Sequence, residues 1–166
     1  MKIGLVGPSY QEESLPFDAQ RTINLYPVFD DKGGKEVAAL YGTPGLSLFC
    51  TVGTGPIRAQ FTSSNGRSFA VSGSQLFEIN AAGIGTLRGN LLFSNGVASM
   101  EENPFQLGIN DGVNFYVFTY ATNAFQLVVN ANIPSVGSFD FIDSYFVANR
   151  NNSGQFNICS PNNGLA

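Results

Sequence analysis

The sequence contains no histidine and no tryptophan, and only 12% of its 166 residues are charged. Without histidine the chain lacks the side chain that most often serves as general base or metal ligand, and a Ser-His-Asp triad cannot form. The two cysteines, Cys50 and Cys159, are too few for a structural zinc site and are expected to stay reduced. We therefore expect no catalytic residue, no metal ligand and no cofactor-binding residue.

Basic residues are absent from residue 89 to residue 149. A surface with acids and no bases repels phosphate, so binding of DNA or RNA through its backbone is not expected from this half of the chain. The simplest interpretation is a solvated acidic face. The candidate residues of this acidic face are Glu101, Glu102, Asp111, Asp140 and Asp143.

Long apolar runs and helical periodicity are missing too. The N-terminal stretch MKIGLVGPSY is too short for the apolar core of a secretory signal, and no later segment is long and apolar enough to span a bilayer. No window shows a sustained period of 3.6 residues, which argues against amphipathic helices. Fifteen Phe and six Tyr instead favour strands, because aromatic side chains suit a pleated surface.

A hairpin pattern is repeated along the chain. SFAVSGSQLFEIN (68–80) alternates apolar and polar residues, turns, and alternates again; QLGINDGVNFYVF (106–118) does the same, and YFVANRNNSGQFNIC (145–159) is a looser third copy. Aligning Phe69, Leu107 and Phe146 gives spacings of 38 and 39 residues. A period near 40 with about four short strands per unit is typical of a β-propeller blade.

These repeats predict an all-β fold, a partial β-propeller of antiparallel four-stranded meanders. We place two complete blades at 57–95 and 96–135 and an incomplete blade at 136–166, whose outer strand is missing. One meander cannot bury both of its apolar faces, so similar sheets are expected to stack on one another.

Residues 1–56 hold no repeat and many glycines and prolines, and are predicted to form an irregular β-rich segment before the blades. Within it TINLYPVF (22–29) and GLSLFCTV (45–52) alternate like two strands, with DDKGGKE (30–36) as a hairpin loop. An extended polar arm precedes them. In this arm Tyr10, Gln11 and Phe17 are candidate contacts with a partner; the alternative is a flexible tail without a role.

Two acidic motifs are candidate sites. NDGVN (110–114) resembles part of a calcium loop but has no closing Glu, and a tight turn with Asp111-Gly112 at its corner explains it better. Asp140 and Asp143 lie three residues apart, which in a strand places them on opposite faces, so they are not expected to form a catalytic carboxylate pair.

Several stretches, taken in order, resemble the packaged-DNA stabilisation proteins of short-tailed phages, a family that includes tail hub or head-completion proteins. The likeness covers nearly the whole chain and corresponds to the N-terminal part of that family. The stretches are QRTINLYP (20–27), ALYGTPGLSLF (39–49), GPIRAQF (55–61), FAVSGSQLFEIN (69–80), VASMEENPFQLGINDG (97–112) and FIDSYFVANRNNSGQFNICSPNNG (141–164).

The resemblance implies a structural protein of the virion tail, made in the bacterial cytoplasm, and not an enzyme. Such hubs form homo-oligomeric rings that help to close the portal channel, retain packaged DNA and seat the tail needle or tailspikes. Portal, adaptor, needle or tailspike proteins are the implied partners, DNA only passes without specific binding, and no membrane insertion is implied. An acidic face would suit a channel wall along which DNA slides.

Two other function classes stay open at this point. A carbohydrate-binding β-propeller or adhesion module would use exposed Tyr116, Phe118 or Tyr120 to stack on sugars, although such modules more often contain tryptophan. An enzyme on a propeller scaffold would need acids that converge at the central funnel, and the strand register predicts no such cluster.

Overall fold

The computed structural model describes residues 23–29, 38–131 and 135–166, and the chain divides into two compact units, residues 1–47 and 48–166. In the first unit β1 (Leu25–Phe29) pairs antiparallel with β2 (Ala38–Gly42). The strand predicted within 22–29 is therefore present. The strand predicted at 45–52 was wrong, because the chain has no regular structure there and the partner of β1 lies earlier, before the breakers Pro44 and Gly45.

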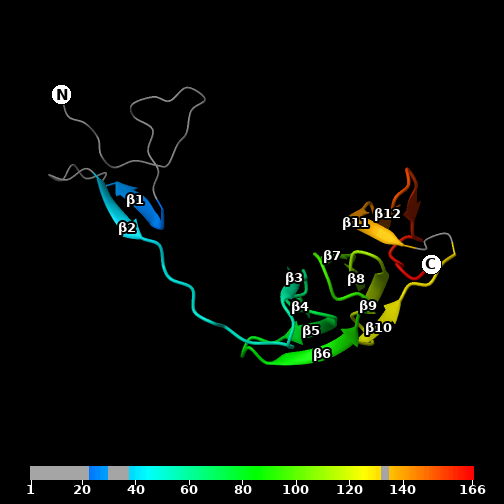
Figure 1. Cartoon of the computed structure of the whole chain (residues 1–166), viewed down its shortest axis with the longest axis horizontal. Helices are drawn as coiled ribbons and strands as arrows, with labels where there is room; N and C mark the ends of the chain where they lie inside the picture. Colours follow the sequence, from blue (N-terminus) through cyan, green and yellow to red (C-terminus); the bar gives the residue numbers. More distant parts are fainter. Residues whose placement is uncertain (1–22, 30–37, 132–134) are drawn as a thin grey trace, which may run out of the picture. The chain divides into compact units, whose positions relative to one another are not determined.

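The second unit contains three antiparallel sheets, each a meander in which consecutive strands pair (Figure 1). The first sheet is β3 (Ile57–Thr62), β4 (Ser68–Ser72), β5 (Gln75–Ile79) and β6 (Gly85–Asn90). The second is β7 (Ser99–Glu102), β8 (Gln106–Asn110), β9 (Phe115–Thr119) and β10 (Ala124–Leu127). The third is β11 (Val136–Ile142), β12 (Tyr145–Arg150) and β13 (Phe156–Ile158). The predicted all-β fold with four-stranded meanders is confirmed.

The hairpins arise from local turn chemistry. Asn65-Gly66 turns the chain between β3 and β4, with Gly66 at φ +83° and its N–H donating to the Ser63 carbonyl over 2.9 Å. Gly112, at φ +99°, lies in the turn between β8 and β9. Glycine adopts these left-handed conformations without the steric cost that a Cβ would bring.

The three residues aligned in the sequence occupy equivalent places in the fold. Phe69, Leu107 and Phe146 are each the second residue of the second strand of their sheet. Their side chains are 1%, 0% and 2% exposed. The repeat in the sequence therefore marks positions at which each sheet buries a large apolar side chain, worth about 1.5–3 kcal/mol apiece.

The sheets of the second unit stack in sequence order. The first strands β3 and β7 contact one another, as do β7 and β11, and β6 contacts β10. Strand β9 shows how both faces of the second sheet are used: Tyr116 and Phe118 join an apolar cluster with the first sheet, whereas Phe115 and Val117 join one with the third sheet. Because β9 is buried on both sides, it reads as the continuous apolar run FYVF rather than as an alternating pattern.

The far face of the third sheet, the one turned away from the second sheet, carries exposed apolar side chains. Phe139 and Phe146 pack toward the second sheet. Their neighbours point the other way, and Ile142, Phe156 and Ile158 are 55%, 69% and 60% exposed. This far face therefore exposes several apolar side chains, with Asp140 in the same cross-strand row as Val147 and Ile158, and no sheet in the described part of the chain covers it.

Candidate functional site

The interface between the first and second sheets is held by a buried arginine. Arg58 in β3 is only 9% exposed and donates five hydrogen bonds of 2.6–2.9 Å to backbone carbonyls. Guanidinium groups bind several fixed acceptors well because their donors form a rigid planar fork. The acceptors belong to the turn after β4, the connection between β6 and β7, and the turn after β8: Gly73, Phe93, Asn95, Gly96 and Asp111.

Asp111 is fully buried and organises the turn between β8 and β9. Its Oδ1 accepts hydrogen bonds from the N–H groups of Val113 (3.0 Å) and Asn114 (2.7 Å), and its Oδ2 accepts from the Tyr116 hydroxyl (2.8 Å). Burial alone would raise the pKa of this carboxyl, but the bonds from Asn114, Tyr116 and Val113 outweigh it and lower the pKa. Oδ2 also accepts from the N–H of Phe93 over 3.1 Å, which ties the turn to the connection from the first sheet.

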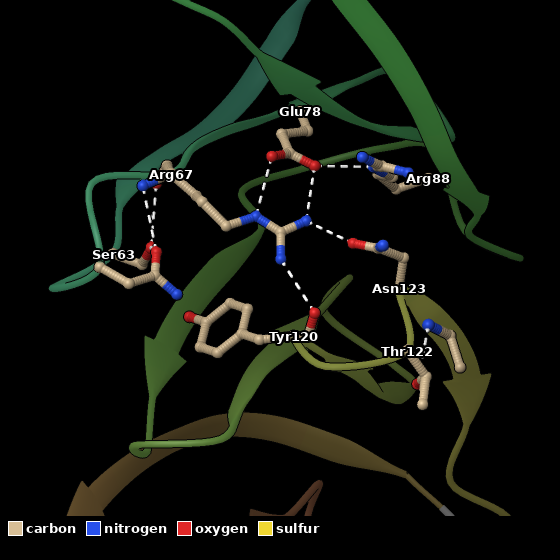
Figure 2. A network of polar contacts seen from close by, with 9 residues as sticks. Ser63, Arg67, Glu78, Arg88, Tyr120, Thr122 and Asn123 are labelled. Atoms are coloured by element: carbon tan, nitrogen blue, oxygen red, sulfur yellow. Dashed lines mark hydrogen bonds and ion pairs between the residues drawn. The ribbon is translucent and has the colours of Figure 1, made fainter.

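A second arginine, Arg67, lies between the same two sheets (Figure 2). It directly precedes β4 and forms a bidentate ion pair with Glu78 of β5. Glu78 also forms an ion pair with Arg88. The hydrogen bond from Arg67 is the main cause that lowers the pKa of Glu78, and the same bond raises the pKa of Arg67. With both carboxylate oxygens bound, the guanidinium is fixed in one orientation.

In that orientation Arg67 reaches the second sheet (Figure 2). Its Nη1 donates to the Tyr120 carbonyl over 3.1 Å and its Nη2 to the Asn123 side chain over 2.6 Å. The guanidinium carbon lies 5.1 Å from the ring centroid of Phe118 and 5.5 Å from that of Phe69. Phe69 and Phe118 themselves meet edge to face with centroids 5.3 Å apart. Ion pairing, hydrogen bonding and cation–π contact thus converge on one interface.

The predicted acidic residues are divided by the fold into different environments. Glu102 belongs to the interface between the first and second sheets, because it accepts the Ser64 N–H (2.7 Å) and the Tyr120 hydroxyl (2.8 Å). Burial, followed by this hydrogen bond to Glu102, raises the pKa of Tyr120. Asp111 is a buried turn residue with 0% exposure, so its assignment to an exposed acidic face was wrong; the predicted turn with Asp111 and Gly112 at its corner is present.

The remaining three predicted acids are accessible to solvent to different degrees. Glu101 in β7 is half-buried, and Asp140 in the neighbouring strand β11 is exposed. Burial, then the charge of Asp140, then that of Glu102, raise the pKa of Glu101. Asp140 on β11 therefore lies close enough to Glu101 on β7 for its negative charge to affect that glutamate. Asp143 is exposed in the turn after β11 at φ +47°, not within a strand as the spacing argument assumed.

The interface between the second and third sheets is mainly apolar. Phe115 meets Phe139 edge to face at 4.8 Å and Phe146 at 5.8 Å between ring centroids. Gly108 leaves room for these rings, because a Cβ there would lie 2.7 Å from Cε2 of Phe139. Polar contacts also cross it; among them, the buried N–H of Gly164 donates to Oε1 of Gln106 over 2.8 Å.

The described residues offer little for chemistry. A cavity of about 170 Å³ beside Cys159 is lined by apolar side chains and amides, with no acidic or basic residue in its wall. The Cys159 sulfur accepts the Phe146 N–H over 3.0 Å, and both cysteines are free thiols. Within residues 23–29, 38–131 and 135–166 no three His, Cys, Asp or Glu side chains gather as a metal site, and no helix could cross a lipid bilayer.

The other candidate residues are found as follows. Tyr10, Gln11 and Phe17 lie outside the described residues. Of the aromatic residues considered for stacking on sugars, Tyr116 and Phe118 are 1% and 0% exposed, so they cannot form a sugar platform. Sequence reasoning missed both Arg58 and Arg67. Arg58 occupies a polar position of the alternating segment IRAQF, and Arg67 directly follows the Asn65-Gly66 turn, and both positions predict solvent exposure.

Comparison with known proteins identifies the family. Residues 1–163 match the profile of the phage stabilisation family, described as bacteriophage P22 Gp10, beta-propeller. A search of curated proteins found no significant match. The stacked meanders agree with the β-propeller in that description. Since the match covers almost the whole chain, this protein belongs to the phage stabilisation family of bacteriophage P22 Gp10.

Proposed function

We propose that this chain is a virion structural protein, a tail hub that helps to close the portal channel, retains packaged DNA and seats the tail needle or tailspikes. The observation that carries the proposal is the family match over residues 1–163. The interfaces between sheets support it, because their polar side chains are used for holding sheets together rather than for chemistry. The protein acts by assembly and binding, in the tail of the particle, and not as an enzyme.

The acidic part of the proposal concerns Glu101 and Asp140, which lie on the first strands of adjacent sheets. In a propeller the first strands of the blades surround the central axis. Carboxylates on such strands would present negative charge to DNA passing nearby and would weaken its adhesion to the protein. DNA is therefore a passing cargo and not a specific ligand.

Self-association is the third part of the proposal. The far face of the third sheet exposes Ile142, Phe156 and Ile158, and apolar sheet surfaces of this kind are covered in stable assemblies. The partner that we propose for this face is a second copy of the chain in a homo-oligomer.

Light scattering tests this self-association. It is expected to report an oligomer that Ile158→Lys weakens, and Ser153→Lys, in an exposed turn, is the control. A monodisperse monomer would contradict this part of the proposal.

The main test is made in a phage or inducible prophage that carries the gene. Without the protein, capsids are expected to package DNA and then lose it, so that purified particles are mostly empty, and supplying the gene in trans restores filled particles. Filled and infectious particles from the deletion would overturn the proposal. A soluble protein that binds glycans on an array and leaves particle assembly unaffected would point to the adhesion alternative.

The acidic part is tested separately. The double variant Glu101→Lys with Asp140→Lys is expected to assemble into filled particles that release DNA more slowly, because lysines near the DNA attract phosphate. Asp143→Lys, in the turn after β11, is the matched control and should release DNA at the parent rate. Equal release from all three proteins would remove the channel role of these acids without affecting the hub assignment.

A further inference from the structure

The chain contains three Asn-Gly pairs, Asn65-Gly66, Asn95-Gly96 and Asn163-Gly164. In such a pair the backbone nitrogen of glycine can attack the asparagine side-chain carbonyl carbon, because no Cβ hinders the approach. The reaction needs a glycine N–H that can lose its proton and an asparagine side chain free to rotate onto it. Hydrogen bonds at either group therefore protect the pair.

Two of the three pairs are protected in this way. At the first, the Asn65 side chain accepts the N–H of Arg67 over 3.1 Å and the hydroxyl of Ser63, while the Gly66 N–H donates to the Ser63 carbonyl over 2.9 Å. Both reacting groups are thus held in the turn between β3 and β4. The pair cannot react until this local structure opens.

The third pair is protected by different partners. The Asn163 side chain accepts the N–H of Leu165 over 3.1 Å, and the buried N–H of Gly164 donates to Gln106 over 2.8 Å. A Cβ at Gly164 would lie 2.8 Å from Val117, so the backbone here is closely packed against the second sheet. Attack by this nitrogen would require the C-terminal residues to leave that position.

Asn95-Gly96 has neither protection. Both residues are exposed in the connection between β6 and β7. Among the described residues, no hydrogen bond engages the Asn95 side chain or the Gly96 N–H, and a Cβ placed on Gly96 would meet nothing within 4 Å. The nucleophile and its target are both free to approach one another.

Arg58 adds an electrostatic reason. Its Nη2 donates to the Asn95 carbonyl oxygen over 2.6 Å, and its Nε donates to the Gly96 carbonyl over 2.8 Å. When the Gly96 nitrogen loses its proton, the negative charge of the amide is shared with the Asn95 carbonyl oxygen. A fixed cation at that oxygen stabilises the deprotonated form, as donors do in an oxyanion hole.

We propose that Asn95 is the site at which this protein undergoes spontaneous deamidation. The deprotonated Gly96 nitrogen attacks Cγ of Asn95, a C–N bond forms, the bond from Cγ to the side-chain nitrogen breaks, and ammonia leaves with the proton. Water then opens the cyclic imide to aspartate or isoaspartate. In the isoaspartate product the main chain runs through Cγ and is one carbon longer, and the former Asn95 backbone carbonyl, which Arg58 binds, becomes the free carboxylate.

The experiment follows the full chain in mildly alkaline buffer made with heavy-oxygen water, which labels each new carboxyl group. Peptide mapping by mass spectrometry gives the conversion of the three pairs over time. Asn95 is expected to convert at least about tenfold faster than Asn65 and Asn163, since each of those must first break local hydrogen bonds. Asn95→Gln is expected to abolish most of the early label.

The same measurement in concentrated urea is the control. Unfolding removes the hydrogen bonds that protect Asn65 and Asn163, so the three rates are expected to approach one another. The proposal is overturned if the folded protein is modified first at Asn65 or Asn163, or if the order and spread of rates are the same with and without urea.

Discussion

Arg67 and Glu78 form an ion pair with two hydrogen bonds, 2.8 Å from Nε to Oε1 and 2.7 Å from Nη2 to Oε2. Glu78 belongs to the first sheet and Arg67 directly precedes strand β4 of that sheet, yet the pair matters for the second sheet. By occupying both oxygens of Glu78, Arg67 directs its Nη1 at the Tyr120 carbonyl and its side chain across Phe118. An interaction within one sheet thus orients a contact between two.

Replacing Glu78 by glutamine should destabilise the protein by about 1 kcal/mol at neutral pH, because the pair is only partly buried. Arg67 lowers the pKa of Glu78 below its usual 4.5. The contribution is therefore present above that value and is lost as pH falls through the lowered pKa. Urea unfolding of parent and Glu78→Gln over a pH series should show the gap closing in acid. Asp143→Asn is the control, and a gap that is constant with pH would contradict the linkage.

Replacing Arg58 by methionine should cost about 3 kcal/mol or more, because five backbone carbonyls lose a charged donor, the one of Asp111 in a buried place and the other four in partly buried places. Arg88→Met is the matched control. The Arg88 side chain is 26% exposed and makes one ion pair, with Glu78, so its replacement should cost about 1 kcal/mol or less. Thermal and urea unfolding measure both variants. Equal losses would show that Arg58 does not hold the sheets together.

Gly108→Ala tests the packing between the second and third sheets. The new Cβ would lie 2.7 Å from Phe139 and 3.1 Å from Phe115, so the rings must move, at a cost of about 1–3 kcal/mol. Gly154→Ala, where nothing lies within 4 Å, is the control and should change little. The free energy of unfolding of the two variants decides; no difference between them would mean that the ring cluster is loosely packed.

The protein should lose stability in alkali through Tyr116. Burial, together with the bond to Asp111, raises the pKa of Tyr116 from its usual 10.0 to about 12. The folded state therefore keeps the proton that the unfolded chain releases, so stability is complete below pH 10 and declines as pH rises toward 12. Tyr116→Phe should remove part of this decline while costing about 1–3 kcal/mol at neutral pH, because the Leu92 N–H loses its acceptor. An alkaline profile identical to the parent's would contradict the assignment.

Replacing the neighbouring residues Glu101 and Glu102 by glutamine should change the stability of the protein in opposite directions. The pKa of Glu101 is raised, first by burial and then by Asp140 and Glu102, so its ionisation opposes folding as pH rises above the usual 4.5. Glu101→Gln is expected to stabilise the protein at neutral pH by roughly 0.2–1 kcal/mol. Glu102→Gln should destabilise it, because the Ser64 N–H and the Tyr120 hydroxyl lose a charged acceptor. Chemical unfolding at pH 7 compares them, and the same sign for both would refute this distinction.

Much of the fold could be predicted from the sequence because its signals are local. Alternation of apolar residues and Asn-Gly or Asp-Gly turns specify hairpins without reference to distant residues. The equivalence of Phe69, Leu107 and Phe146 could be predicted for the same reason, since each repeat carries its own pattern. The partner strand of β1 was predicted at 45–52 instead of at β2. Two short apolar stretches follow β1, and only the observed strand pairing shows which of them is its partner.

The residues that hold the sheets together could not be predicted in this way. Alternation in IRAQF places Arg58 on the face opposite Ala59, as for a solvated residue, but a register shift between Ile57 and Ala59 and the arrival of the next repeat bury it. Its acceptor in Asp111 lies 53 residues away. Asp111 looked like one member of an acidic face because its charge is visible in the sequence, whereas the hydrogen bonds that its buried carboxylate accepts are not.

The sequence by itself determined that this chain forms repeated antiparallel hairpins with large apolar residues at fixed places, because those properties depend on neighbours a few positions apart. Only the tertiary structure decided which charged side chains are buried and which stay in water. That choice depends on groups brought together from separate repeats, such as Arg67 with Asn123 and Arg58 with Asn95, and a buried charge is stable only where those distant partners meet it.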